Sequence, residues 1–165
     1  MKYAKKALKN VMPTKLTLFL DSSVLISALN SPIGASAKIL NLAKEQKITL
    51  IISPYIIDET KRVIQKKLPK LKAPLIELEK ENLLKISKDP NIPKVKSALK
   101  IIKDPKDAPI LAAAIKSKAT FLITLDKKDF IDDKNVAKKS KLKILTPGDF
   151  INFSKYYQLQ KQHLI

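Results

Sequence analysis

Carboxylates are scarce in this chain, and several of them adjoin apolar segments. The 165 residues contain 15 Asp and Glu against 33 Lys and Arg. Four acids directly follow an apolar run or lie early in a predicted helix: Asp21, Glu59, Asp107 and Asp126. Because few acids are available, these positions make the four residues candidates for one shared site.

Carboxylate and hydroxyl oxygens are nearly the only side-chain groups in this chain that could bind a metal or take part in catalysis. It has no cysteine, and its one histidine is His163. Thiolate metal sites and disulfides are therefore excluded, and histidine catalysis or a His-rich zinc site has almost nothing to work with. Carboxylates that converge without a cationic neighbour raise one another's pKa or need a cation. A cluster of this kind suits Mg²⁺ or Mn²⁺, which can activate water and stabilise charge on a phosphoryl group.

The same acids also have ordinary structural explanations, which the sequence leaves open. Asp21 could close the turn after its apolar run, with the hydroxyls of Ser22 and Ser23 making local hydrogen bonds. Glu59 could be an exposed helix residue that pairs with Arg62. Asp126 could be a simple turn residue.

Further polar residues beside the four acids are auxiliary candidates: Asp104, Asp129, Ser23 and Thr124. Asp104 precedes Pro105 and could serve only as a helix cap, and Asp107 could likewise be there because carboxylates favour the positive end of a helix dipole. The Thr124 hydroxyl could serve its strand alone, or it could be aimed at a carboxylate or a metal-bound water. Three other acids are expected at the solvated surface: Asp58, Asp132 and Asp133.

Four short apolar runs predict the strands that position these acids: Leu16–Leu20, Ile48–Ile52, Phe121–Thr124 and Leu142–Leu145. Each run is nearly continuous rather than alternating, as expected of parallel strands that are buried on both faces.

Helical patterns fill the segments between the strands. Helices are predicted at Ala35–Lys47, Pro54–Lys67, Ala73–Ser87, Val95–Ile102 and Asp107–Lys118, with a short one from Pro147. Ser53 is the predicted N-cap before Pro54, and the segment from Asp89 to Lys94 is predicted to be a loop.

Strands that alternate with helices predict an α/β fold, a three-layer α/β/α domain with a mostly parallel central sheet. In such a sheet all strands end at one edge, and ligands bind in the crevice outside it. Asp21 and Asp126 are expected at this edge, and Glu59 and Asp107 can lean toward it from helices that start nearby.

The chain carries a formal net charge of +18, and all its basic residues except Arg62 are lysines. A solubilising surface could explain this charge, but it also suits a polyanionic partner such as a nucleic acid. Lys127 and Lys128 could contact RNA phosphates beside the acids. The apolar stretch near the N-terminus is short and broken by Asp21, so no membrane association is expected, and a cytoplasmic location is the default.

Five stretches resemble the PIN domain family, in that family's order. They are "LFLDSSVLISAL", "IISPYIIDETKRVI", "KDPKDAPILAAAI", "FLITLDKKDF" and "LKILTPGDFI". The resemblance implies a metal-dependent endonuclease of single-stranded RNA. By position, Asp21, Glu59, Asp107 and Asp126 would be its catalytic and metal-binding quartet, with Asp104 and Asp129 as auxiliary acids. Ser23 stands where the family commonly has asparagine.

The resemblance also divides the chain into a basic N-terminal extension (1–15), a PIN-like nuclease domain (16–153) and a C-terminal tail (154–165). It implies RNA as substrate, an antitoxin protein if the chain is the toxin of a toxin–antitoxin pair, and a homodimer. A housekeeping RNA-processing nuclease and a non-catalytic RNA-binding module are the alternatives.

Overall fold

The computed structural model describes residues 15–162, with side chains described as far as residue 157. The predicted N-terminal extension lies almost entirely outside this range, as does the end of the predicted tail. Within the described range, the helix α9 (Pro147–Gln162) continues through residue 153 without interruption.

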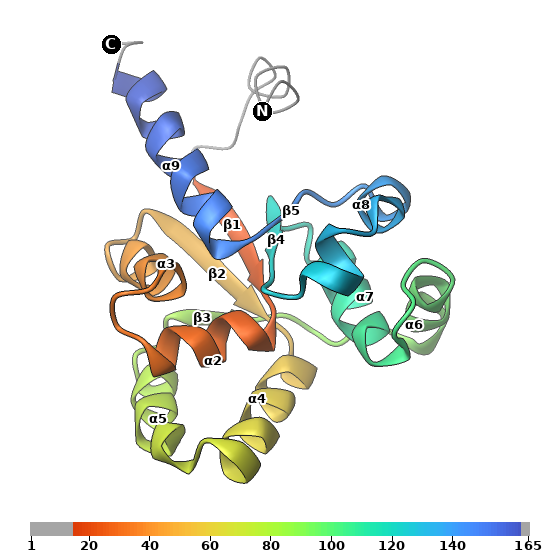
Figure 1. Ribbon diagram of the computed structural model, residues 1–165, viewed down its shortest axis with the longest axis horizontal. Coiled ribbons are helices and arrows are strands. Elements are labelled where there is room, and N and C mark those ends of the chain that lie inside the picture. Colours follow the sequence, from red (N-terminus) through yellow and green to blue (C-terminus); the bar gives the residue numbers. More distant parts are fainter. Residues whose placement is uncertain (1–14, 163–165) are drawn as a thin grey trace.

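A five-stranded, entirely parallel sheet forms the centre of the fold (Figure 1). Its strands are β1 (Leu16–Leu20), β2 (Ile48–Ile52), β3 (Leu84–Ile86), β4 (Phe121–Ile123) and β5 (Ile144–Leu145). The predicted three-layer α/β/α architecture is confirmed.

The strand order β3-β2-β1-β4-β5 places a reversal of chain direction beside β1. The chain builds outward from β1 to β2 and β3, then crosses back to β4 on the other side of β1. Right-handed crossovers in opposite directions place their helices on opposite faces of the sheet. A crevice is therefore expected outside the carboxyl ends of β1 and β4, where α/β proteins commonly bind ligands.

Helices cover both faces of this sheet (Figure 1). Besides α9, they are α2 (Ser22–Asn30), α3 (Ala35–Lys44), α4 (Pro54–Lys67), α5 (Lys72–Lys80), α6 (Ile92–Leu99), α7 (Ala108–Ser117) and α8 (Lys134–Ser140). Shorter helical turns occur at Pro69–Leu71, Pro105–Asp107 and Lys127–Ile131.

The central strands are apolar on both faces, as their continuous sequence pattern predicts. Leu18, Phe19 and Leu20 of β1 have no exposed surface, and Phe150 of α9 is equally buried. The α9 helix packs its Phe150 and Phe153 rings edge-on against Phe121, with centroid distances of 5.9 and 5.1 Å. This packing fixes the strands from whose ends the candidate site is built.

Several predicted boundaries are confirmed. The strands β1 and β2 and the helix α4 have the predicted limits. Ser53 is the N-cap of α4, and its hydroxyl accepts a hydrogen bond from the Ile56 N–H at 3.4 Å.

Other predicted boundaries are wrong. The predicted helix Ala73–Ser87 ends at Lys80, and its last residues form the edge strand β3. The helix α6 already begins at Ile92, inside the predicted loop. The helices α2 and α8 were not predicted.

No single helix within residues 15–162 is both long and apolar enough to cross a membrane. The helices α2 and α3 together reach the required length and composition, but their axes are bent by 92°.

Candidate functional site

Asp21 lies between β1 and α2 and is 4% exposed. Two hydroxyls donate to its Oδ2: Ser23 Oγ at 2.7 Å and Thr124 Oγ1 at 2.7 Å. Ser22 Oγ donates to Oδ1 at 3.3 Å. We call these four residues the Asp21 pocket. Its hydroxyls compensate the cost of burying a carboxylate.

The local sequence explains why Asp21 is held so firmly. Its N–H donates to the Ile123 carbonyl at 3.0 Å, which extends the pairing of β1 with β4 by one residue. Its carbonyl accepts the first hydrogen bonds of α2, yet its carboxylate caps no helix N–H. Asp21 therefore occupies a cap position without using its side chain as a cap, and its oxygens face the hydroxyls instead.

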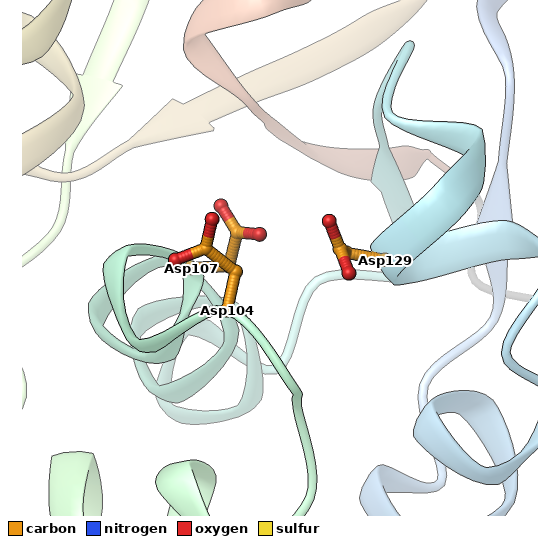
Figure 2. A group of neighbouring side chains, drawn as sticks. All are labelled: Asp104, Asp107 and Asp129. Atoms are coloured by element: carbon orange, nitrogen blue, oxygen red, sulfur yellow. The ribbon is translucent and has the colours of Figure 1, made fainter.

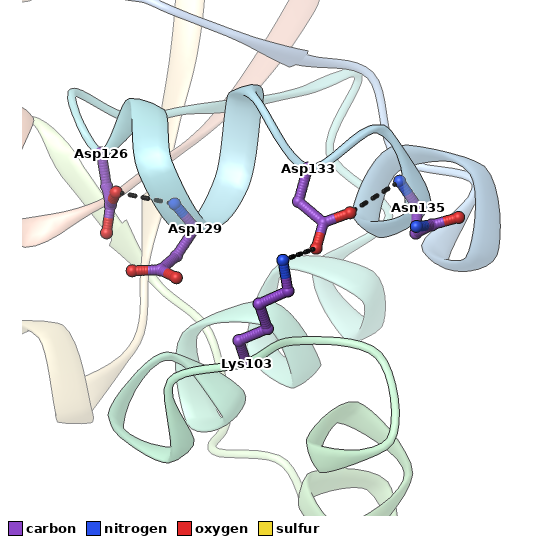
Figure 3. Close-up of polar contacts among 5 residues, drawn as sticks. All are labelled: Lys103, Asp126, Asp129, Asp133 and Asn135. Carbon is purple, nitrogen blue, oxygen red and sulfur yellow. Dashed lines mark hydrogen bonds and ion pairs between the residues drawn. The ribbon is translucent and has the colours of Figure 1, made fainter.

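The segment after β4 is tied to the same pocket. Thr124 Oγ1 accepts the Asp126 N–H at 3.0 Å, and Ser23 Oγ accepts the Leu125 N–H at 3.2 Å. Asp126 Oδ1 in turn accepts the Asp129 N–H at 3.0 Å and so caps the π-helical turn that follows (Figure 3). Asp126 thus has the turn role that the sequence left open, while its carboxylate stays beside the other acids.

Three carboxylates converge from two segments, Asp104 and Asp107 at the turn before α7 and Asp129 in the turn after β4 (Figure 2). One oxygen each from Asp104, Asp107 and Asp129 lies within 4.8 Å of the other two. We call these three residues the acid cluster. Asp104 Oδ1 also accepts the Lys106 N–H at 2.9 Å, which confirms its predicted role as a cap.

The electrostatics of Asp107 show how closely these acids gather. Burial raises its pKa, and so do the negative charges of four other acids, in decreasing order Asp126, Asp104, Asp21 and Asp129. Together they bring the pKa of Asp107 to about 7, from an ordinary value of 3.8. Five of the six predicted site carboxylates therefore share one electrostatic environment, centred on Asp107.

Glu59 lies on α4 and is not among the acids that raise the pKa of Asp107, but the carboxylates of Glu59 and Asp107 both raise the pKa of Tyr55. Glu59 Oε2 is buried and has no hydrogen-bond partner within the described part of the chain. Asp58, beside it, is exposed, as the sequence predicts. The Tyr55 hydroxyl donates to the Lys106 carbonyl at 3.2 Å, and its pKa is raised by burial and then by the carboxylate of Glu59.

Tyr55 is a residue that the sequence analysis missed. It precedes Glu59 by four positions, so the two share one face of α4. Its hydroxyl joins that helix to the turn that carries Asp107. The four-residue spacing could have indicated this contact.

Asp133 was expected at the solvated surface, and that prediction is wrong. Its side chain is only 11% exposed, and it pairs with Lys103 Nζ at 3.2 Å (Figure 3). The hydrogen bond from the Asn135 N–H, together with Lys103, lowers the pKa of Asp133. This ion pair ties the residue before Asp104 to the segment that follows Asp129. Asp132, in contrast, is exposed.

The donor set fits a hard divalent cation. It consists of carboxylate oxygens, and among the described residues no lysine or arginine side chain forms an ion pair with them. The partnerless oxygen of Glu59 and the raised pKa of Asp107 are the features that a positive charge would relieve. Lys127 and Lys128 are exposed at the same end of β4.

Comparison with known proteins gives one family and several similar folds. The family described as PIN domain matches residues 17–128. VapBC2 from Rickettsia felis, solved bound to a DNA fragment from its promoter, aligns with a TM-score of 0.58 and 20% identity, over 79% of this chain and 98% of that one. PAE2754 from Pyrobaculum aerophilum aligns with a TM-score of 0.54 and 20% identity, over 82% and 86% of the two chains. No curated protein matches the chain in sequence.

Proposed function

This chain belongs to the PIN domain family, and on that premise we propose that it is a metal-dependent endoribonuclease that hydrolyses single-stranded RNA. The observation that carries the proposal is the gathering of acids around Asp107 at the end of β1 and β4. Such a concentration of negative charge opposes folding unless it serves a cation.

Mg²⁺ or Mn²⁺ would be held by Asp21, Glu59, Asp107 and Asp126, with Asp104 and Asp129 as auxiliary acids. When bound, the cation lowers the pKa of a water and offsets the charge that develops on the phosphoryl group. It also screens these carboxylates from the incoming polyanion.

The chain's own residues divide the remaining work. The hydroxyls of Ser23 and Thr124 hold Oδ2 of Asp21 in one position, so this carboxylate is oriented before any ligand binds. The pKa of Asp107 is about 7 without a cation, and a bound cation would lower it and keep Asp107 ionised as a ligand. Lysines, including Lys127 and Lys128, supply the attraction for the RNA backbone.

We further propose that the chain acts as the toxin of a toxin–antitoxin pair, in the cytoplasm, with a protein antitoxin and as a homodimer. The similarity of fold to the Rickettsia felis VapBC2 complex supports the antitoxin. Co-expression with the product of the neighbouring gene, followed by size-exclusion chromatography, tests it. A silenced ribonuclease in the complex is expected, whereas an active one would favour a housekeeping nuclease.

Cleavage of a labelled single-stranded RNA tests the enzyme. The full chain is assayed with Mn²⁺, with Mg²⁺ and with EDTA, beside Asp21→Asn, Asp107→Asn and Glu59→Gln. Each substitution is expected to lower the rate by about a thousandfold, because each removes a ligand worth several kcal/mol in the transition state.

Asp58→Asn is the matched control, since Asp58 is exposed beside Glu59 on the same helix. It is expected to cleave at the wild-type rate. Equal cleavage by Asp107→Asn and by wild type would refute the assignment. RNA binding that is independent of metal and occurs without cleavage would instead identify a non-catalytic binding module.

A further inference from the structure

A groove beside Asp126 is lined partly by the start of a helix and is not used by the proposed chemistry. It has a volume of about 560 Å³ and is lined by residues of α2, α3, the segment after β4 and the start of α9. Leu125 and Lys127 both line it, and they flank Asp126 in the sequence. One short segment thus faces the candidate metal site and the groove at once.

The start of α3 faces this groove with its hydrogen-bond donors unused. The N-cap is Gly34, which has no side chain to cap with, and the first turn contains no acid. Within residues 15–162, no acceptor is found for the N–H groups of Ala35, Ser36 and Ala37. Free N–H groups at a helix N-terminus carry partial positive charge and favour a bound anion.

Ser36 is a second, independent sign that the groove suits a hydrogen-bonding ligand. It lines the groove although it is only 3% exposed, and its hydroxyl makes no hydrogen bond within the described part of the chain. Its oxygen is not among the fully buried atoms that lack a partner, so a ligand in the groove can reach it. The Ser36 hydroxyl and the N–H groups beside it can donate to the same oxygen atoms.

Other lining residues decide what kind of anion fits. Lys127 adds a positive charge. Asp132 and Asp149 also line the groove, although Asp149 already accepts the Thr146 hydroxyl at 2.6 Å at the start of α9. Two carboxylates disfavour a dianion more than a monoanion. They can also accept hydrogen bonds from sugar hydroxyls or base amino groups.

We propose that the groove binds a backbone phosphodiester of the RNA strand, next to the bond that is cleaved, with the oxygens of the phosphate on the free N–H groups of α3 and on the Ser36 hydroxyl. The inference rests on the proposed function only in its choice of RNA as the ligand. The subsite would hold the strand so that a neighbouring phosphate reaches the acids.

A carboxylate introduced at the N-cap of α3 should occupy the place of the phosphate and so test the subsite. Gly34 has a φ of −74°, and the nearest atom to an added Cβ is Ser31 Oγ at 3.7 Å, so a side chain fits there without strain. Gly34→Asp places an N-cap that occupies the free N–H groups and should raise the melting temperature. Gly34→Ala adds neither a charge nor an acceptor and is the matched control.

Binding of a fluorescent single-stranded RNA to the full chain is measured by anisotropy in EDTA, so that no cleavage occurs. Gly34→Asp is expected to bind about five- to tenfold more weakly than Gly34→Ala, because an anion loses the helix N-terminus. Ser36→Ala should weaken binding with little change in melting temperature, and it carries the test if Gly34→Asp does not fold. Equal affinities for all four proteins, including wild type, would overturn the subsite.

Two further measurements separate this inference from its alternatives. Inorganic phosphate is expected to compete poorly with RNA, and efficient competition would identify a free-phosphate site instead. The same variants are assayed for cleavage with Mn²⁺. If the wild type cleaves RNA and Gly34→Asp binds RNA with wild-type affinity, the phosphate subsite is refuted and the nuclease assignment stands. If the wild type does not cleave RNA but Gly34→Asp binds RNA more weakly than Gly34→Ala, the nuclease assignment is refuted and the phosphate subsite stands.

Discussion

The Asp21 pocket and the acid cluster hold the same kind of side chain by opposite means. In the pocket, hydroxyls of Ser22, Ser23 and Thr124 donate to one buried carboxylate. In the cluster, half-buried carboxylates face one another, and Asp107 has its pKa raised to about 7. The pocket is complete in the protein alone, whereas the cluster lacks a compensating charge.

This difference teaches that a site can be rigid and unsatisfied at once. The pocket fixes one ligand in advance, which lowers the entropic cost of binding a cation. The cluster attracts positive charge strongly, because it takes part in no ion pair within the described part of the chain. The pocket and the cluster should therefore respond differently to metal, to substitution and to pH.

The largest expected effect is stabilisation of the cluster by metal. Mn²⁺ at a hundredfold excess over its dissociation constant should raise the free energy of unfolding by about 2.7 kcal/mol. Thermal unfolding with Mn²⁺ and with EDTA measures this. Asp107→Asn should lose most of the gain, and Asp58→Asn should keep all of it. An equal gain in Asp107→Asn would show that the cluster does not hold the ion.

Removing a hydrogen-bond donor from the Asp21 pocket should lower the free energy of unfolding by slightly less than Mn²⁺ raises it. Thr124→Val deletes one of the two 2.7 Å hydrogen bonds to Asp21 Oδ2. A hydrogen bond to a buried charge contributes about 2 kcal/mol, so unfolding in urea should shift by that amount, with or without metal. Thr124→Ser keeps the hydroxyl and is the control. Little change in Thr124→Val would mean that the pocket is not preassembled.

Removing a charge from the cluster should stabilise the protein, whereas removing a donor from the pocket should destabilise it. Without metal, Asp107→Asn should stabilise the protein by about 1–2 kcal/mol above pH 7, after allowance for solvent screening of a half-buried group. The pKa of Asp107 is raised from 3.8 to about 7, so the folded state binds an extra proton between these values and stability falls as pH rises through them.

The gain in Asp107→Asn should therefore be absent below pH 4, grow between pH 4 and 7, and stay constant above. Urea unfolding of both proteins across this range in EDTA measures it. A gain in stability that does not vary with pH would mean that folding does not raise the pKa of Asp107.

The smallest effect should come from the link between α4 and the cluster. Tyr55→Phe deletes the hydrogen bond to the Lys106 carbonyl and should cost about 0.5–1 kcal/mol. Because this bond holds the turn before α7, Mn²⁺ affinity measured by calorimetry should also fall severalfold. Unchanged affinity would restrict Tyr55 to a purely structural role.

The sequence predicted best where local pattern and burial agree. The runs that form β1 and β2 are continuous and buried at every position except Thr17 and Thr49, which are partly buried, and α4 has both its cap and its proline. The edge strand β3 was missed because it is three residues long and exposes Lys85 and Ile86, so it lacks the pattern of a buried strand. Its pairing with β2, not its composition, makes it a strand.

The acids of the candidate site were easier to predict from the sequence than the residues that hold them in position. The strand ends placed Asp21 and Asp126, because parallel strands finish at one edge. The sequence could not show that Ser23 and Thr124 donate to the same oxygen, since that depends on β1 lying beside β4. The Lys103–Asp133 pair was missed for the same reason: it joins two segments that meet only in the folded chain.

The hydrogen bond between Asp21 and Thr124 joins positions 103 residues apart. On a ribosome, the second partner is added on the order of 5–20 seconds after the first. For that interval the growing chain has β1 and its carboxylate but neither β4 nor Asp129. If the protein cleaves RNA as proposed, the fragment cannot attack the messenger that encodes it until most of the domain has been synthesised.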